Sequence, residues 1–194
     1  MKIIGITGGV GSGKSAILQF LETEYNACVC QMDETAKLLQ KQGTECFRKI
    51  VTAFGETVVG PDGELDRKQL GSIVFQDEKK LQILNDIVHP EVLQWVRADI
   101  EQKRSEGKKL YIVEAALLPE VGKELCDELW YIYTKESVRR ERLKASRHYS
   151  DEKITQMIRS QMAEEAFRRA CDVEIDNSGD LESTKKQIRR KIEE

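Results

Sequence analysis

Residues 8–15 read GGVGSGKS, and this stretch decides how the rest of the chain is interpreted. It matches the pattern G-x-x-x-x-G-K-[ST] through Gly8, Gly13, Lys14 and Ser15. The apolar run Lys2–Thr7 before it is typical of a buried strand, and Lys14–Glu24 after it has helical periodicity. A glycine-rich turn between a strand and a helix indicates a phosphate-binding loop, or P-loop.

The spacing of this loop suits a nucleoside triphosphate. Glycines allow successive backbone N–H groups to converge on phosphate oxygens, at a helix N-terminus that carries roughly half a positive charge. We expect Lys14 to reach the β- and γ-phosphates, and the Ser15 hydroxyl to ligate a Mg²⁺ ion that bridges the same phosphates. The alternative, a glycine-rich turn without a ligand, is disfavoured by the flanking strand and helix.

Apolar runs elsewhere in the chain alternate with helical segments, which is typical of a parallel sheet covered by helices. We expect further strands at residues 27–32, 110–118, 129–134 and 173–176. We expect helices at residues 34–42, 136–170 and 181–194. Residues 46–104 read as mainly helical, with a turn at Pro61-Asp62-Gly63, N-caps at Asp66 and Asp77, and a helix that starts at Pro90 and ends near Gly107. The pattern predicts an α/β fold with a helical insertion.

Composition and charge limit the classes of protein to consider. The 194 residues are 40% hydrophobic and 34% charged, which is typical of a folded protein and disfavours disorder. A formal net charge of −3 gives no global field to attract nucleic acid or an anionic membrane. The five cysteines are odd in number and form no Cys-x-x-Cys pair, so neither a disulfide framework nor a zinc site is expected.

The sequence predicts neither a signal peptide nor a membrane span. The apolar strand pattern starts at the second residue, which leaves no room for a signal peptide. The longest apolar run, near residues 110–118, is far shorter than the ~20 residues that span a bilayer. We therefore expect a cytoplasmic protein that acts without nucleic acid, without a membrane and without an obligate protein partner.

The loop leaves the phosphate acceptor open, because GTPases, transport ATPases and small-molecule kinases all contain it. The sequence has no Asn-Lys-x-Asp for guanine recognition, and its one Asp-x-x-Gly, at residues 176–179, comes too late in the chain to act as a switch. No apolar strand after the loop ends in Asp, as in many motor-type ATPases, unless Glu114 takes that place. A compact kinase fits these observations better.

Asp33 directly follows the second predicted strand. In an open parallel sheet the carboxyl ends of the strands face the ligand crevice, so a carboxylate there is able to meet the acceptor hydroxyl. It would act as a general base or orient the oxygen for in-line attack. The same position suits an N-cap of the following helix, and the spacing leaves both interpretations open.

Other candidate residues have an ordinary structural explanation beside the functional one. Arginines in a basic run could close over the triphosphate, although such runs are usually solvated helix faces. The run consists of Arg139, Arg140, Arg142, Lys144 and Arg147. The pair His89-Pro90 can simply end one helix and start the next. Trp95 and Trp130 are expected in the core, although Trp95 could also stack on an adenine.

Along nearly its whole length the chain resembles the dephospho-CoA kinases. The resemblance begins at IGITGGVGSGKS and Asp33-x-x-Ala36, and continues through GELDRKQLGSIVF at residues 63–75, Ile87-Val88-His89-Pro90 and Ala116-Leu117-Leu118-Pro119-Glu120. It extends to Arg142-Leu143, Gln161 and the stretch Cys171-Asp172-x-x-Ile175-Asp176-Asn177.

This resemblance implies a fold, a domain organisation and a reaction. The fold would be a P-loop NTPase core, a three-layer α/β/α parallel sheet, with a helical substrate-binding domain and a helical lid. The core would comprise residues 1–34, 108–135 and 171–194, the CoA-binding domain residues 35–107, and the lid residues 136–170. The reaction would transfer the γ-phosphate of ATP to the ribose 3′-hydroxyl of dephospho-CoA, the last step of coenzyme A biosynthesis.

The resemblance also implies roles for individual residues. Asp33 would be the catalytic base, with Lys14 and Arg142 as further catalytic residues, and Ser15 would ligate Mg²⁺. Arg67 and His89, together with Asp33, would line the acceptor side. The ATP site would consist of Gly8, Gly9, Gly11, Ser12, Gly13, Lys14, Ser15, Ala16 and Arg147.

Three positions depart from the family pattern. Gln31 stands where many relatives have another aspartate, and Ala116 replaces the usual proline. The lid arginine after Arg142 is shifted to Arg147, with Ser146 in between.

The rival functions are a nucleoside or nucleoside monophosphate kinase, and a regulator that binds ATP and moves its lid without transferring phosphate.

Overall fold

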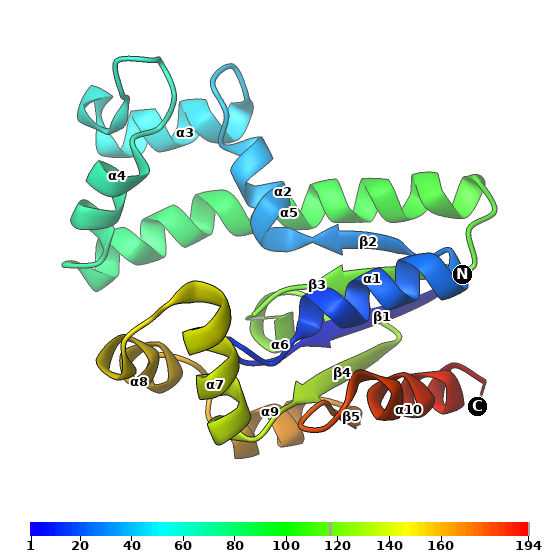
Figure 1. Ribbon diagram of the computed structural model, residues 1–194. Coiled ribbons are helices and arrows are strands. Elements are labelled where there is room, and N and C mark those ends of the chain that lie inside the picture. The colour runs from blue at the N-terminus through cyan, green and yellow to red at the C-terminus, as the bar shows by residue number, and fades with distance from the viewer. Residues whose placement is uncertain (117, 194) are drawn as a thin grey trace. The chain divides into compact units, whose positions relative to one another are not determined.

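A computed structural model describes residues 1–116 and 118–193 (Figure 1). The chain forms two compact units. We call residues 1–30 and 103–194 the sheet unit, and residues 31–102 the helical unit. Leu117, from the segment that resembles the family's Pro-Leu-Leu-x-Glu, lies outside the described residues.

The sheet has five strands in the order β2-β3-β1-β4-β5. Strand β1 is parallel to both β3 and β4, and β4 is parallel to β5. Within this register Ile6 of β1 lies opposite Glu114 of β3 and Trp130 of β4. The strands are β1 (Lys2–Thr7), β2 (Cys28–Gln31), β3 (Leu110–Glu114), β4 (Glu128–Tyr133) and β5 (Val173–Asp176). They confirm the predicted parallel sheet, with β3 ending earlier than expected.

Helices cover both faces of the sheet, which confirms the three-layer prediction. Helices α1 (Lys14–Tyr25) and α10 (Leu181–Glu193) lie along one face (Figure 1), where apolar side chains of alternate strand positions form the main core. On the other face the Tyr131 ring stacks on Phe167 of α9 (Glu164–Ala170), with ring centroids 4.9 Å apart. That face is also covered by α6 (Leu118–Val121) and the short helix η2 (Lys123–Leu125).

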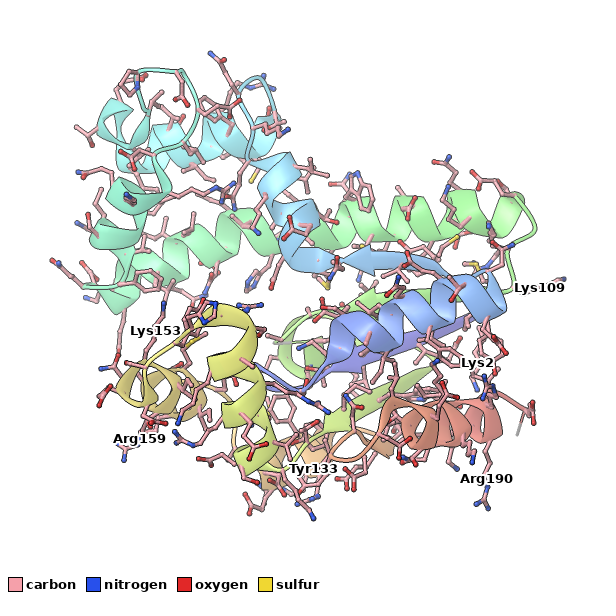
Figure 2. All side chains as sticks on the ribbon, viewed as in Figure 1. Lys2, Lys109, Tyr133, Lys153, Arg159 and Arg190 are labelled. Carbon is pink, nitrogen blue, oxygen red and sulfur yellow. The ribbon has the colours of Figure 1, made fainter. Side chains whose placement is uncertain are left out.

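Residues 136–170 form helices, as predicted, but with two interruptions. Helix α7 (Glu136–Arg147) is followed by its C-cap His148, whose φ of 53° is left-handed. Helix α8 (Asp151–Arg159) starts after Ser150, whose hydroxyl accepts from the Lys153 N–H. Figure 2 labels Lys153 and Arg159, two residues of α8 with exposed side chains.

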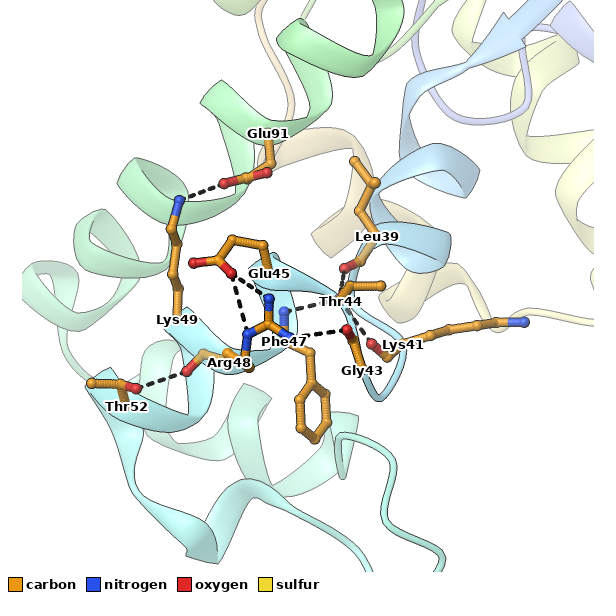
Figure 3. Close-up of polar contacts among 10 residues, drawn as sticks. All are labelled: Leu39, Lys41, Gly43, Thr44, Glu45, Phe47, Arg48, Lys49, Thr52 and Glu91. Carbon is orange, nitrogen blue, oxygen red and sulfur yellow. Dashed lines mark hydrogen bonds and ion pairs between the residues drawn. The ribbon is translucent and has the colours of Figure 1, made fainter.

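The helical unit contains α2 (Met32–Leu39), α3 (Glu45–Phe54), η1 (Glu56–Val58), α4 (Arg67–Val74) and most of α5 (Glu78–Ser105). Thr44 caps α3 through the Phe47 N–H, while an ion pair between Lys49 and Glu91 joins α3 to α5 (Figure 3). Asp66 and Asp77 accept from the first amides of α4 and α5, which confirms both predicted N-caps.

The predicted helix boundary at Pro90 is wrong, because α5 runs through it as one helix of 28 residues. Proline inside a helix removes one hydrogen bond and costs about 3 kcal/mol. The buried stripe Val88, Val92, Val96 and Ile100 continues across the proline at helical spacing, and its burial outweighs that cost.

Trp130 is fully buried as expected, but Trp95 is 39% exposed, so the core prediction fails for Trp95.

The five cysteines are free thiols. Burial raises the pKa of Cys126 to about 12 and that of Cys171 to about 11, so both thiols stay protonated at neutral pH.

Among the described residues, no helix combines the length and the apolar character that crossing a membrane requires.

The core of the sheet unit predicts a large effect of Ile4→Ala. Ile4 is fully buried in the central strand, so its truncation should lower the free energy of unfolding by about 2–5 kcal/mol. Urea denaturation followed by circular dichroism measures this change. Leu181→Ala, at a side chain that is 38% exposed, is the control and should cost much less; equal losses would contradict this core.

Candidate active site

The P-loop connects β1 to the N-terminus of α1 in the sheet unit. Gly13 caps α1 in the left-handed conformation, with φ 85° and ψ 21°. A Cβ atom at this position would lie 2.5 Å from Nδ2 of Asn177, so only glycine fits here. The loop is further closed by a hydrogen bond of 3.1 Å from the Ser12 N–H to the Gly9 carbonyl. The first amides of α1 therefore follow a tight turn, as in anion sites at helix N-termini.

The Ser12 carbonyl oxygen fixes this loop to the strand ends. It accepts from Asn177 Nδ2 at 2.7 Å, from Thr134 Oγ1 at 3.1 Å and from Arg142 Nη1 at 3.4 Å. Thr134 and Asn177 are the residues directly after β4 and β5, and Arg142 comes from α7. The second arm of Arg142 donates to the Asn177 carbonyl at 2.9 Å. Three separate elements thus converge on one backbone atom of the P-loop.

The Ser12 hydroxyl is buried and, within the described part of the chain, has no hydrogen-bond partner. Leaving a buried hydroxyl unpaired costs about 1–3 kcal/mol. A phosphate oxygen bound in this loop would be a suitable acceptor for it.

Lys14 folds back over the loop. Its Nζ donates to the Gly8 carbonyl at 2.8 Å and lies 3.5 Å from Oε1 of Glu114, the last residue of β3. The side chains of Lys14 and Glu114 are only 17% and 11% exposed. The carboxylate therefore compensates the lysine charge at the place where a phosphate would bind.

Ser15 and Ala16 are exposed at the start of α1. Mg²⁺ usually binds to nucleotide phosphates and to one or two protein oxygens. The Ser15 hydroxyl and the Glu114 carboxylate are oxygen donors of that kind, so the residues at this loop fit the ion.

The basic run on α7 divides into two faces. Arg139 and Arg142, three residues apart, contact the P-loop. Arg140 and Lys144, four residues apart, form ion pairs with Asp151 of α8 at 3.8 and 2.8 Å. Arg147, the last residue of α7, is exposed. The run is therefore not a uniformly solvated helix face, and the predicted role of its arginines at the triphosphate stays a prediction.

Asp33 belongs to the helical unit and lies in the first turn of α2, with an exposed side chain. The N-cap of α2 is Gln31, and no side-chain hydrogen bond caps this helix. The alternative interpretation of Asp33 as an N-cap is therefore wrong, because the helix starts two residues earlier than expected.

Arg67 and His89 also belong to the helical unit. Arg67 donates to Gln40 Oε1 at 2.9 Å and borders a recess of about 350 Å³. The recess is lined by Lys37, Gln40, Lys41, Glu64, Leu65 and Arg67. His89 is half-buried in the middle of α5, one residue before Pro90.

Several residues at the P-loop were not among the predicted site residues. Asn177 and Gln161 were named only in stretches that resemble the family. Arg139 was named only as a member of a basic run, and Thr134 lay at the end of a predicted strand. For Thr134 and Asn177, the position directly after parallel strands was the sequence signal that they belong to the site. Nothing local in the sequence distinguishes Arg139 from its neighbours.

Comparison with known proteins supplies independent findings. A family model described as dephospho-CoA kinase matches residues 2–183. A dephospho-CoA kinase of Carboxydothermus hydrogenoformans is 38% identical over 189 residues, which cover 97% of this chain and 91% of the relative. A crystal structure of a Thermus thermophilus protein is similar with a TM-score of 0.80 and 30% identity, covering 98% of this chain and 96% of that one. A dephospho-CoA kinase structure from Campylobacter jejuni has a TM-score of 0.72 at 22% identity, with coverages of 100% and 96%.

The contacts of Ser12 predict a specific effect of Asn177→Asp. The substitution replaces the amide donor with a carboxylate that faces the Ser12 carbonyl, so the loop loses a bond and gains repulsion. The Kd for ATP should rise about tenfold, measured by isothermal titration calorimetry. Asn26→Asp adds the same charge at an exposed position and should change the Kd by about twofold or less. Equal affinity of Asn177→Asp and the unmodified protein would refute the anchoring role.

Proposed function

This chain belongs to the dephospho-CoA kinase family, and we propose how its own residues transfer the γ-phosphate of ATP to the ribose 3′-hydroxyl of dephospho-CoA. The observation that carries the proposal is the pairing of Lys14 with the Gly8 carbonyl and with Glu114 on a P-loop fixed to the sheet. Catalysis of phosphoryl transfer consists mainly of positioning and electrostatic stabilisation, and a fixed loop serves both.

ATP would bind with its phosphates on the backbone amides of the P-loop. We propose that Lys14 then exchanges the Gly8 carbonyl for the β- and γ-phosphates, while Glu114 keeps the ammonium group in place. The proposed ATP site also contains Arg147 and the loop residues Gly8, Gly9, Gly11, Ser12, Gly13, Ser15 and Ala16.

Mg²⁺, held by the Ser15 hydroxyl and by the phosphates, would neutralise negative charge on the triphosphate during the reaction. Glu114, whose Oε1 lies 3.5 Å from Lys14 Nζ, is a carboxylate that contacts the loop and could supply a further oxygen ligand. The charge of Arg142, which already lies at the Ser12 carbonyl, would stabilise the transferring group.

On the acceptor side we propose Asp33 as the group that orients the 3′-hydroxyl and takes its proton. Its carboxylate is exposed in the first turn of α2, so a substrate is able to reach it. Residues 35–107 would hold the CoA moiety, with Arg67 and His89 on the acceptor side, and residues 136–170 would act as the lid over a core of residues 1–34, 108–135 and 171–194. We propose the cytoplasm as the site of action.

A direct assay tests the acceptor. Purified protein is mixed with Mg²⁺-ATP and with dephospho-CoA, AMP, CMP, adenosine or no acceptor, and ADP release is recorded while the product is identified by mass. We expect ADP release that depends on dephospho-CoA and yields CoA. Release with a monophosphate alone would favour a nucleotide kinase, and no release with any acceptor would favour a regulator that only binds ATP.

The role of Asp33 predicts that Asp33→Asn lowers kcat by about 10²–10⁴ while the Kd for ATP stays nearly unchanged. The amide keeps the shape of the side chain but is unable to accept the proton. Steady-state kinetics with dephospho-CoA and calorimetry with ATP measure the two quantities. Glu34→Gln removes the neighbouring exposed carboxylate and serves as the matched control. A normal kcat for Asp33→Asn would show that the base is another group.

A further inference from the structure

The tip of the P-loop is held by a second contact, at Val10. Both backbone polar groups of Val10 are bonded to side chains that are distant in the sequence. Its N–H donates to Gln161 Oε1 at 2.9 Å, and its carbonyl accepts from Arg139 Nε at 2.8 Å. Arg139 Nη2 also donates to Gln161 Oε1, at 3.0 Å. These three hydrogen bonds form a closed triangle, which we call the Val10 clamp.

Arg139 lies very close to the loop. A Cβ atom at position 9 would stand 2.4 Å from Arg139 Nη2, so the guanidinium occupies the space that the missing side chain of Gly9 leaves. The arginine is partly buried, and this burial lowers the pKa of its guanidinium below the ordinary value. A partly buried cation needs acceptors, and the Val10 carbonyl and Gln161 provide them.

Both clamp side chains come from the segment 136–170. Arg139 lies in the first turn of α7, and Gln161 lies between α8 and α9. The Val10 clamp therefore joins the loop to two separate parts of this segment. It is distinct from the contacts at the Ser12 carbonyl, which come chiefly from the strand ends.

From this geometry we infer that Gln161 and Arg139 are positioning residues that hold the P-loop in its ATP-binding shape and couple it to the segment 136–170. The inference rests on the proposed function, in which the loop binds ATP. A loop that is already ordered loses less conformational entropy on binding, so a ligand binds to it more tightly. Without the clamp the Val10 N–H and one Arg139 N–H would lack their shared acceptor, and the loop would be free to adopt other shapes.

The decisive variant is Gln161→Met, which keeps the length of the side chain but removes the acceptor oxygen. We expect the Kd for ATP to rise about tenfold, because two hydrogen bonds to one acceptor are lost. The KM for dephospho-CoA should stay within about twofold, because the residues proposed for the acceptor side, Asp33, Arg67 and His89, are not part of the clamp. Gln161→Glu keeps an oxygen for both N–H groups, and the adjacent Arg139 guanidinium offsets its added charge, so this variant should restore most of the ATP affinity.

The controls separate positioning from folding. Gln156→Met makes the same change at an exposed position on α8 and should bind ATP like the unmodified protein. Thermal unfolding by circular dichroism checks that each variant is folded at the temperature of the binding measurement. If Gln161→Met does not fold, Arg139→Lys provides the second test: it keeps the charge but loses the fork that reaches both acceptors, and should also weaken ATP binding several-fold.

Two results would overturn the inference. One is a folded Gln161→Met that binds ATP as tightly as the unmodified protein. The other is equal weakening by Gln161→Met and Gln161→Glu, since the acceptor oxygen would then be irrelevant. Calorimetry with ATP alone gives these results independently of the acceptor, so a failure of the clamp is distinguishable from a failure of the proposed reaction.

Discussion

The parallel pairing of β1 with β3 on one side and β4 on the other is the constraint on which the site depends. Because parallel strands end at the same edge of a sheet, this pairing brings together the residues that follow or finish each strand. The P-loop follows β1, Glu114 finishes β3, and Thr134 and Asn177 follow β4 and β5. Buried apolar side chains on both faces hold the strands in this register, so the core places the polar groups.

The P-loop is consequently fixed by contacts of two kinds. Strand ends and Arg142 reach the Ser12 carbonyl, whereas Arg139 and Gln161 reach Val10. Lys14, between a backbone carbonyl and Glu114, has charge compensation before any nucleotide arrives. Such an arrangement is preorganised, because these contacts fix the shape of the loop before any ligand binds.

Structural features that depend on neighbouring residues were predicted correctly from short sequence patterns. The P-loop, the strands and the N-caps at Asp66 and Asp77 follow from short-range spacing, and the structure confirms them. The helix break at Pro90 was wrong, because burial of Val88, Val92 and Val96 outweighs a local preference. The Val10 clamp joins residues 151 positions apart, and no periodicity or motif encodes such a distance. The role of Asp33 was expected from its place after the second strand and from the family resemblance, whereas the roles of Arg67 and His89 come from the resemblance alone, and all three stay predictions.

The anchor at Ser12 has a consequence for how this protein is able to vary. A backbone carbonyl oxygen is present in every amino acid, so no change of residue at position 12 removes the acceptor. Mutations alter this anchor only through its three donors, which lie at Thr134, Arg142 and Asn177. The evolutionary pressure that preserves the shape of the nucleotide loop should therefore appear at positions more than a hundred residues away from it, outside the motif by which the loop is recognised.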